Sequence, residues 1–278
     1  MKLLAAKGWM KLALMAFLAA GAASALYGDT IVPTYLTAKT EAPDTTALCS
    51  DTSICWVGEQ SFAKSSVPAA GVFPVVTTVG SPTGTISGTY SGSLTVSGAN
   101  EYGGTGGTGY FASVSDGSYT LKLTTSGDLP GVNYFGLWFS ALDAGNDLKF
   151  YEKNAQGTET LLYDFTPALF QKLVGSCPNS SNAFCGNPSG AYKGEDSGEQ
   201  YAFLNFFDTT GYIDEIVFTE TTSAGLESDN QTVAYLDPIE ASDTVIGTTP
   251  EPGTFVLLSI GAMAFILFRR PLAVKGMN

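Results

Sequence analysis

Histidine is absent from all 278 residues of this chain. Its absence excludes a Ser-His-Asp triad, a Cys-His nucleophile pair and any imidazole metal site. Arginine occurs only at Arg269 and Arg270, so the bidentate clamps that arginine forms on phosphates and carboxylates are missing from most of the chain. Most nucleophilic and phosphoryl-transfer enzymes are thereby disfavoured, and we expect the protein not to be an enzyme.

Positive charge is also scarce. The chain has 13 lysine and arginine residues against 26 aspartate and glutamate residues. Three basic residues precede residue 26 and three follow Pro252, whereas all the acids lie between, so this body keeps seven lysines against 26 acids, a net charge of −19. Such a surface repels nucleic acid and anionic lipid and attracts cations. We therefore expect no nucleic-acid partner.

Residues 1–25 are typical of a signal peptide. They contain three lysines, then an apolar run over residues 12–20, then small residues at Ala23 and Ala25. This order matches the basic region, hydrophobic region and cleavage site of a secretory signal. The run is too short to cross roughly 30 Å of hydrocarbon. We predict export and cleavage by signal peptidase after Ala25.

Four cysteines lie in the body, and an even number in an exported chain suggests disulfides. Sequence proximity favours the pairs Cys49–Cys55 and Cys177–Cys185, and the two other pairings stay open. Zinc is a poor alternative, because histidine is absent and neither spacing is C-x-x-C.

Residues 26–240 show the pattern of an all-β domain. Short segments with strand character alternate with turn signals rich in Asp, Asn and Gly. One short helix is expected after Thr166 and Pro167, ending at Gly175. We predict an antiparallel β-sandwich with a jelly-roll-like form. The predicted strands cover residues 85–90, 93–97, 118–125, 134–142, 148–152, 160–165, 201–207, 212–219 and 231–236.

Oxygen-bearing side chains gather in the turn that holds Asp143, Asn146 and Asp147. Calcium takes 6–8 oxygen ligands, so these three residues are candidate calcium ligands. The same residue types are also what any turn prefers. Glu227, Asp229 and Asn230 are a second acidic group, which fits either a structural cation site or a solvated face.

Aromatic side chains that stack on sugars are another kind of candidate, and Trp56, Trp138, Tyr110 and Tyr192 qualify. Trp138 lies in the middle of a predicted strand and is expected in the core. Trp56 follows Cys55 directly, so we expect it to pack on a disulfide.

The C-terminal end has three parts. A short polar linker, residues 241–249, leads into Pro250, Glu251 and Pro252, which keep the backbone extended. An uncharged apolar run of 16 residues, 253–268, follows and would span about 24 Å as a helix. Arg269 and Arg270 then orient that helix with its C-terminal end in the cytoplasm. We predict a transmembrane sorting segment over residues 250–273.

This three-part segment resembles the PEP-CTERM sorting domain. The resemblance covers about 25 residues, and residues 271–278 extend further beyond the arginines than is usual for the family. It implies recognition by exosortase, a multipass membrane enzyme of Gram-negative bacteria. It also implies transient residence in the inner membrane, followed by the cell surface or extracellular matrix.

Several functions are compatible with these features. The family resemblance favours a structural or adhesive role in exopolysaccharide or biofilm, with extracellular polysaccharide as a candidate partner. One alternative is a calcium-dependent carbohydrate-binding module. Another is a polysaccharide-degrading enzyme, because paired carboxylates serve glycoside hydrolysis, although nothing in the sequence singles out one pair.

Overall fold

Two antiparallel β-sheets form the domain in the computed structural model, which describes residues 31–62, 68, 70–239 and 244–245. The larger sheet contains β1 (Ile31–Tyr35), β2 (Ile54–Gln60), β4 (Val75–Val79), β6 (Thr95–Gly98), β7 (Tyr110–Val114), β9 (Tyr134–Leu142), β12 (Gln200–Asp208), β14 (Leu226–Asp237) and β15 (Thr244–Val245). The smaller sheet contains β3 (Ala70–Val72), β5 (Ile86–Gly92), β8 (Gly117–Thr125), β10 (Asn146–Lys153), β11 (Glu159–Phe165) and β13 (Glu215–Glu220).

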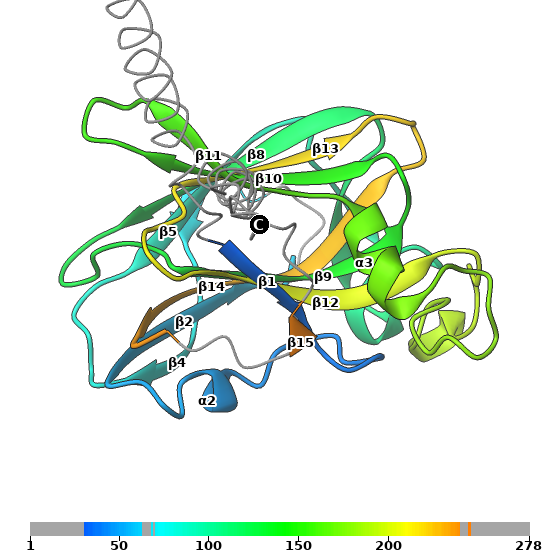
Figure 1. Cartoon of the computed structure of the whole chain (residues 1–278), viewed down its shortest axis with the longest axis horizontal. Helices are drawn as coiled ribbons and strands as arrows, with labels where there is room; N and C mark the ends of the chain where they lie inside the picture. The colour runs from blue at the N-terminus through cyan, green and yellow to red at the C-terminus, as the bar shows by residue number, and fades with distance from the viewer. Residues whose placement is uncertain (1–30, 63–67, 69, 240–243, 246–278) are drawn as a thin grey trace, which may run out of the picture. The chain divides into compact units, whose positions relative to one another are not determined.

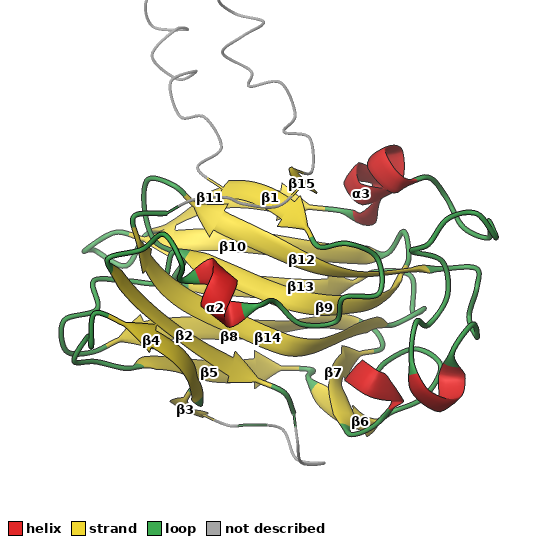
Figure 2. Ribbon diagram, turned by 90° about the horizontal axis from the view of Figure 1, so that it is seen from below, coloured by secondary structure: helices red, strands yellow, loops and turns green. Residues whose placement is uncertain are grey.

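The strand order confirms the predicted antiparallel sandwich. The larger sheet runs β15-β1-β12-β9-β14-β2-β4, with β7 also paired to β14 and β6 paired to β7, and the smaller sheet runs β11-β10-β13-β8-β5-β3. From β7 to β10 and from β11 to β14, each connection crosses from one sheet to the other, as in jelly rolls. Figures 1 and 2 show the two sheets stacked face to face.

The predicted signal peptide, with Ala23 and Ala25, and the predicted sorting segment, with Pro250, Glu251, Pro252, Arg269 and Arg270, lie outside the described residues. The predicted transmembrane helix lies there too. Within the part of the chain that the structure describes, no helix is long and apolar enough to cross a membrane.

Strand β9 lies at the centre of the larger sheet and is buried along its whole length. Because successive side chains of a strand point to opposite faces, Phe135, Leu137 and Phe139 enter the main core between the sheets. Tyr134 and Trp138 instead join separate apolar clusters on the opposite face. The strand predicted over residues 134–142 is therefore confirmed and is buried on both faces, and Trp138 is confirmed as a core residue.

Aromatic rings hold the two sheets together. Phe206 of β12 in the larger sheet packs with its ring centroid 4.5 Å from that of Phe150 and 5.5 Å from that of Phe165, both in the smaller sheet. Phe206 and both of its partners are fully buried. Such ring pairs contribute beyond the area that they bury, so this contact is a main point of attachment between the layers.

A buried polar network also joins the sheets. The Tyr90 hydroxyl donates to Gln231 Oε1 over 2.7 Å, and Gln231 Nε2 donates to the Tyr119 hydroxyl over 3.1 Å and to Ser228 Oγ over 3.0 Å. Tyr90 and Tyr119 belong to the smaller sheet, and the other two residues belong to β14. Mutual hydrogen bonding satisfies groups that would be costly to bury alone.

The helix predicted after Thr166 is confirmed as α3 (Pro167–Val174). The prediction of one helix was nevertheless wrong, because α2 (Thr45–Leu48) is a second. Asp44 begins α2 by accepting hydrogen bonds from the backbone N–H groups of Thr46 and Ala47, each over 3.0 Å. A single turn is too short to show a helical repeat of apolar residues, so its cap was the only available signal.

Part of the predicted linker joins the domain. Thr244 and Val245 form β15, which pairs antiparallel with Tyr35 and Thr34 of β1. These two residues of the predicted linker extend the larger sheet at the edge that β1 presents, where a backbone segment completes its hydrogen bonds.

Replacing Phe206 with alanine tests the attachment between the sheets. We expect a loss of about 3–5 kcal/mol in the free energy of unfolding, because a large buried ring leaves a cavity. Val76→Ala is the control, since Val76 is 50% exposed, and it should change stability by less than about 0.5 kcal/mol. Urea unfolding followed by circular dichroism measures both, and equal effects of the two variants would contradict this role.

Candidate functional site

The cysteines form the two disulfides that proximity favoured. Cys49 is bonded to Cys55 and Cys177 to Cys185. The expectation that Trp56 packs on the first disulfide was wrong, because Cys55 lies in the cluster on the outer face of the larger sheet whereas Trp56 lies in the main core. Neighbouring residues of a strand point to opposite faces.

The turn predicted to bind calcium brings Asp143 and Asn146 together. The side-chain nitrogen of Asn146 donates to Glu220 Oε2 and to the carbonyl oxygen of Gly225, each over 2.7 Å, and lies 3.5 Å from Asp143 Oδ2. Its side-chain oxygen accepts from the backbone N–H of Asp143 over 3.1 Å. That second bond determines the amide orientation, so an N–H group lies where three oxygens converge.

Asp147 lies apart from the other two predicted ligands. It follows Asn146 in β10, so its side chain points to the opposite face of the smaller sheet. There it forms an ion pair with Lys149, which also lies 3.6 Å from Asp164. Among the described residues, no group of three acidic, histidine or cysteine side chains is arranged to hold a metal ion. Calcium binding at this turn stays a prediction.

Acidic side chains gather around Glu227 on β14. Its side chain is largely buried, and within the described residues its carboxyl group makes no hydrogen bond or ion pair. The charges that act on it are all carboxylates, from Glu199, Asp143, Glu220 and Asp196. Burial first, and these neighbours second, raise the pKa of Glu227 to about 9.

The same cause acts on a neighbour of Glu227. Burial, followed by the charges of Asp196 and Asp143, raises the pKa of Glu199 to about 7. The Tyr201 hydroxyl lies 2.7 Å from Asp196 Oδ2 and 2.6 Å from the carbonyl oxygen of Glu101, and its single proton can be donated to either, which ties this group to the loop that follows β6. At neutral pH Glu227, and in part Glu199, therefore keep a proton that a solvent-exposed glutamate would lose.

The raised pKa of Glu227 predicts a pH-dependent stability. A carboxyl whose pKa is higher in the folded state stabilises the fold fully below its unfolded pKa, near 4.5, and that contribution is lost as the pH rises through about 9. Glu227→Gln removes the ionisation, so we expect this variant to be about 1–3 kcal/mol more stable than the parent at pH 8 and little changed at pH 4.

Thermal melts from pH 4 to pH 9 measure this difference. Glu195→Gln is the matched control, because Glu195 is an exposed glutamate in the segment before β12, and it should follow the parent at every pH. A Glu227→Gln variant with the pH profile of the parent would show that Glu227 is not protonated in the folded state.

The second acidic group predicted from the sequence is anchored by the glycine-rich loop. Asp229 Oδ2 accepts hydrogen bonds from the backbone N–H of Thr105 over 3.0 Å and from its hydroxyl over 3.2 Å. Burial raises the pKa of Asp229 to about 7 despite these bonds. This glycine-rich loop, residues 103–109, contains the 3₁₀ turn η1 (Thr105–Gly107) and covers an acidic side chain.

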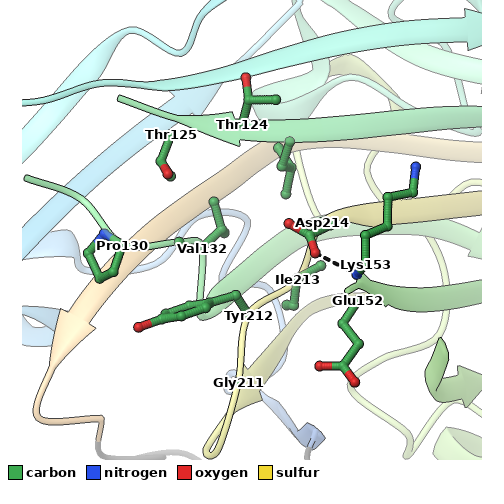
Figure 3. A pocket seen from close by; sticks show the side chains of 12 residues that line it. Thr124, Thr125, Pro130, Val132, Glu152, Lys153, Gly211, Tyr212, Ile213 and Asp214 are labelled. Carbon is green, nitrogen blue, oxygen red and sulfur yellow. Dashed lines mark hydrogen bonds between the residues drawn. The ribbon is translucent and has the colours of Figure 1, made fainter. Parts of the chain in front are cut away.

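A cleft opens at one end of the sandwich, where loops connect the two sheets. It has a volume of about 280 Å³ and is called here the Tyr212 cleft. Figure 3 shows Tyr212 on one side of it, with Glu152 and Asp214 on the other. The residues that line it are Leu123, Thr124, Thr125, Pro130, Gly131, Val132, Glu152, Lys153, Gly211, Tyr212, Ile213 and Asp214.

The sequence did not indicate Tyr212, the aromatic residue of this cleft, as a binding residue. Tyr212 was placed in a predicted strand over residues 212–219, but β13 begins at Glu215, so Tyr212 lies in the preceding loop and is 37% exposed. Among the candidates that were named, Trp56 and Trp138 are buried, and the Tyr192 hydroxyl donates to the carbonyl oxygen of Ala99 over 3.1 Å. The turn signal Asp208-Thr-Thr-Gly directly before Tyr212 was the available clue.

Comparison with known proteins identifies one feature. The family model for the PEP-CTERM protein-sorting motif matches residues 248–270. No curated protein and no solved structure matches the chain. The motif confirms the predicted sorting signal and implies export through the membrane-associated exosortase system to the cell surface.

Proposed function

We propose that the β-sandwich of this exosortase-sorted protein has a structural or adhesive role in the exopolysaccharide or biofilm matrix outside the cell. The observation that carries the proposal is the sorting motif at residues 248–270. It marks the chain for processing at the membrane, so that the domain preceding it becomes the exported product.

The domain has properties that suit the outside of a cell. Two disulfides constrain its loops, which is typical of oxidising compartments. Its body carries a net charge of −19, with seven lysines against 26 acids, which favours solubility and repels anionic lipid. Both features support a protein that is released from the membrane after processing.

The C-terminal sequence of the protein recovered from the cell surface tests the proposed processing. We expect mass spectrometry to show that the apolar run 253–268 and the two arginines have been removed. Replacing Glu251 with alanine should leave the tail in place and keep the chain in the membrane fraction, because it removes the acidic residue of the Pro-Glu-Pro part of the matched motif.

Asp243→Ala is the control for Glu251→Ala, since it removes an acidic residue that precedes the matched motif. It should be processed like the parent. An exported chain that retains residues 253–270 would overturn the sorting mechanism.

We further propose that the role is non-enzymatic. The chain has no histidine and no arginine before residue 269. The acidic side chains that gather around Glu227 leave it crowded by like charges, and Glu227 itself is largely buried. Incubation of the protein with the exopolysaccharide of its host should release no reducing ends above the background of a boiled sample. Release that depends on Glu227 or Glu199 would support the hydrolase alternative instead.

A further inference from the structure

We propose that the Tyr212 cleft binds sugar rings of a polysaccharide that carries no acidic groups. This inference deepens the matrix role proposed for the domain, and rests on it, by naming the chemical class of the partner. It stands on three features of the cleft: an aromatic ring at its edge, polar groups without partners around it, and its negative charge.

The ring of Tyr212 is held in place by its surroundings. A methyl group on Gly131 would lie 2.2 Å from Tyr212 Cγ and 2.4 Å from Cδ1, so the ring lies directly against the backbone of Gly131. Only glycine permits this approach. The ring also adjoins a second concavity of about 330 Å³, which shares Gly211 and Tyr212 with the cleft. An immobilised aromatic ring between two hollows is suited to stacking on successive sugar rings.

Polar groups at the cleft are free to bind hydroxyls. Within the described residues, the side chains of Glu152, Thr124 and Thr125 and the hydroxyl of Tyr212 make no hydrogen bonds, and all four line the space. Asp214 uses Oδ2 to accept from the backbone N–H of Lys153 over 2.6 Å. A carbohydrate offers hydroxyl groups that donate to carboxylates and accept from threonine.

A buried carboxylate lies behind Gly211. Asp208 is fully buried, and among the described residues its Oδ2 has no hydrogen-bond partner. A methyl group on Gly211 would lie 3.3 Å from this oxygen and 3.5 Å from Glu152 Oε2. Two carboxylate oxygens therefore face the residue at which the two hollows meet. Asp208 lines neither hollow, so Glu152 is the carboxylate that a sugar hydroxyl in the cleft can reach.

The charge of the cleft selects against acidic glycans. Its one basic residue, Lys153, already forms ion pairs with Glu215 at 2.9 Å and Glu159 at 3.1 Å. Glu152 and Asp214 leave the rim negative, and a uronic acid or phosphate would meet like charges there. The ligand is therefore a non-acidic polysaccharide.

Affinity electrophoresis of the exported chain tests this inference in gels that contain a neutral galactomannan, a neutral β-glucan or alginate. We expect a neutral gel to retard the protein and alginate to leave it unaffected. Tyr212→Ala should weaken binding about tenfold or more, because a central aromatic contact dominates such interfaces. Tyr212→Phe keeps the ring and should bind within about twofold of the parent.

Tyr102→Ala is the matched control, because Tyr102 is 43% exposed and does not line the cleft, so it should bind like the parent. If Tyr212→Ala loses its thermal transition, Glu152→Gln serves instead and should weaken binding. The inference is overturned if no neutral gel retards the parent, if alginate retards it equally, or if a folded Tyr212→Ala binds like the parent. If the protein does not bind sugar but its C-terminal tail has been removed, the sorting proposal stands and only the sugar-binding inference fails. If the protein binds sugar but keeps its tail, only the sorting proposal fails.

Discussion

Contact between the inner faces of the two sheets is the constraint on which the rest of this domain depends. Phe206 meets Phe150 and Phe165 across the interior, while Gln231 and Tyr119 satisfy each other in the same buried layer. The aromatic contacts supply area, and the hydrogen bonds restrict how β14 lies over the smaller sheet. Consecutive strands alternate between the two sheets over much of the chain. The loops that connect them therefore lie together at the ends of the sandwich.

The outer face of the larger sheet carries apolar side chains that must also be covered. A central strand such as β9 has apolar side chains on both faces, and those of Tyr134 and Trp138 need a cover. The Cys49–Cys55 disulfide lies over one part, and Tyr201 is tied to the loop at Glu101 over another. Covering this face also confines Glu227 among other acids. Covering the central strands therefore places an acidic side chain where burial and neighbouring carboxylates disfavour its charged form.

The Tyr212 cleft arises from the way in which one loop passes between the sheets. The turn after β12 leads from Asp208 to β13, and Tyr212 lies on Gly131 as the chain crosses. Polar groups from β8 and β10 come to the same end of the sandwich. A cell-surface domain with such a cleft can engage a polymer without any change in its core, since the binding groups lie on loops and strand ends.

Much of the architecture was predictable from local patterns. Apolar and aromatic runs located β9 and β12, a threonine followed by proline located α3, and the short spacing of cysteines indicated both disulfides. The sorting signal could also be recognised, because Pro-Glu-Pro, an apolar run and two arginines follow one another in the sequence. Strands β1 to β4, strand β7 and helix α2 were missed, since short segments without a clear alternation of apolar and polar residues carry little periodic signal.

The sequence by itself therefore determined that the chain is exported, sorted and built from antiparallel strands. Only the tertiary structure decided which polar residues meet. Asp143 and Asn146 come together and Asp147 does not, because alternate residues of a strand point apart. Glu227 and Glu199 meet because the larger sheet places β14 and β12 on either side of β9. Tyr212 meets Gly131 where two loops cross from one sheet to the other. A pairing of residues far apart in the chain depends on long-range packing, which no local pattern of residues records.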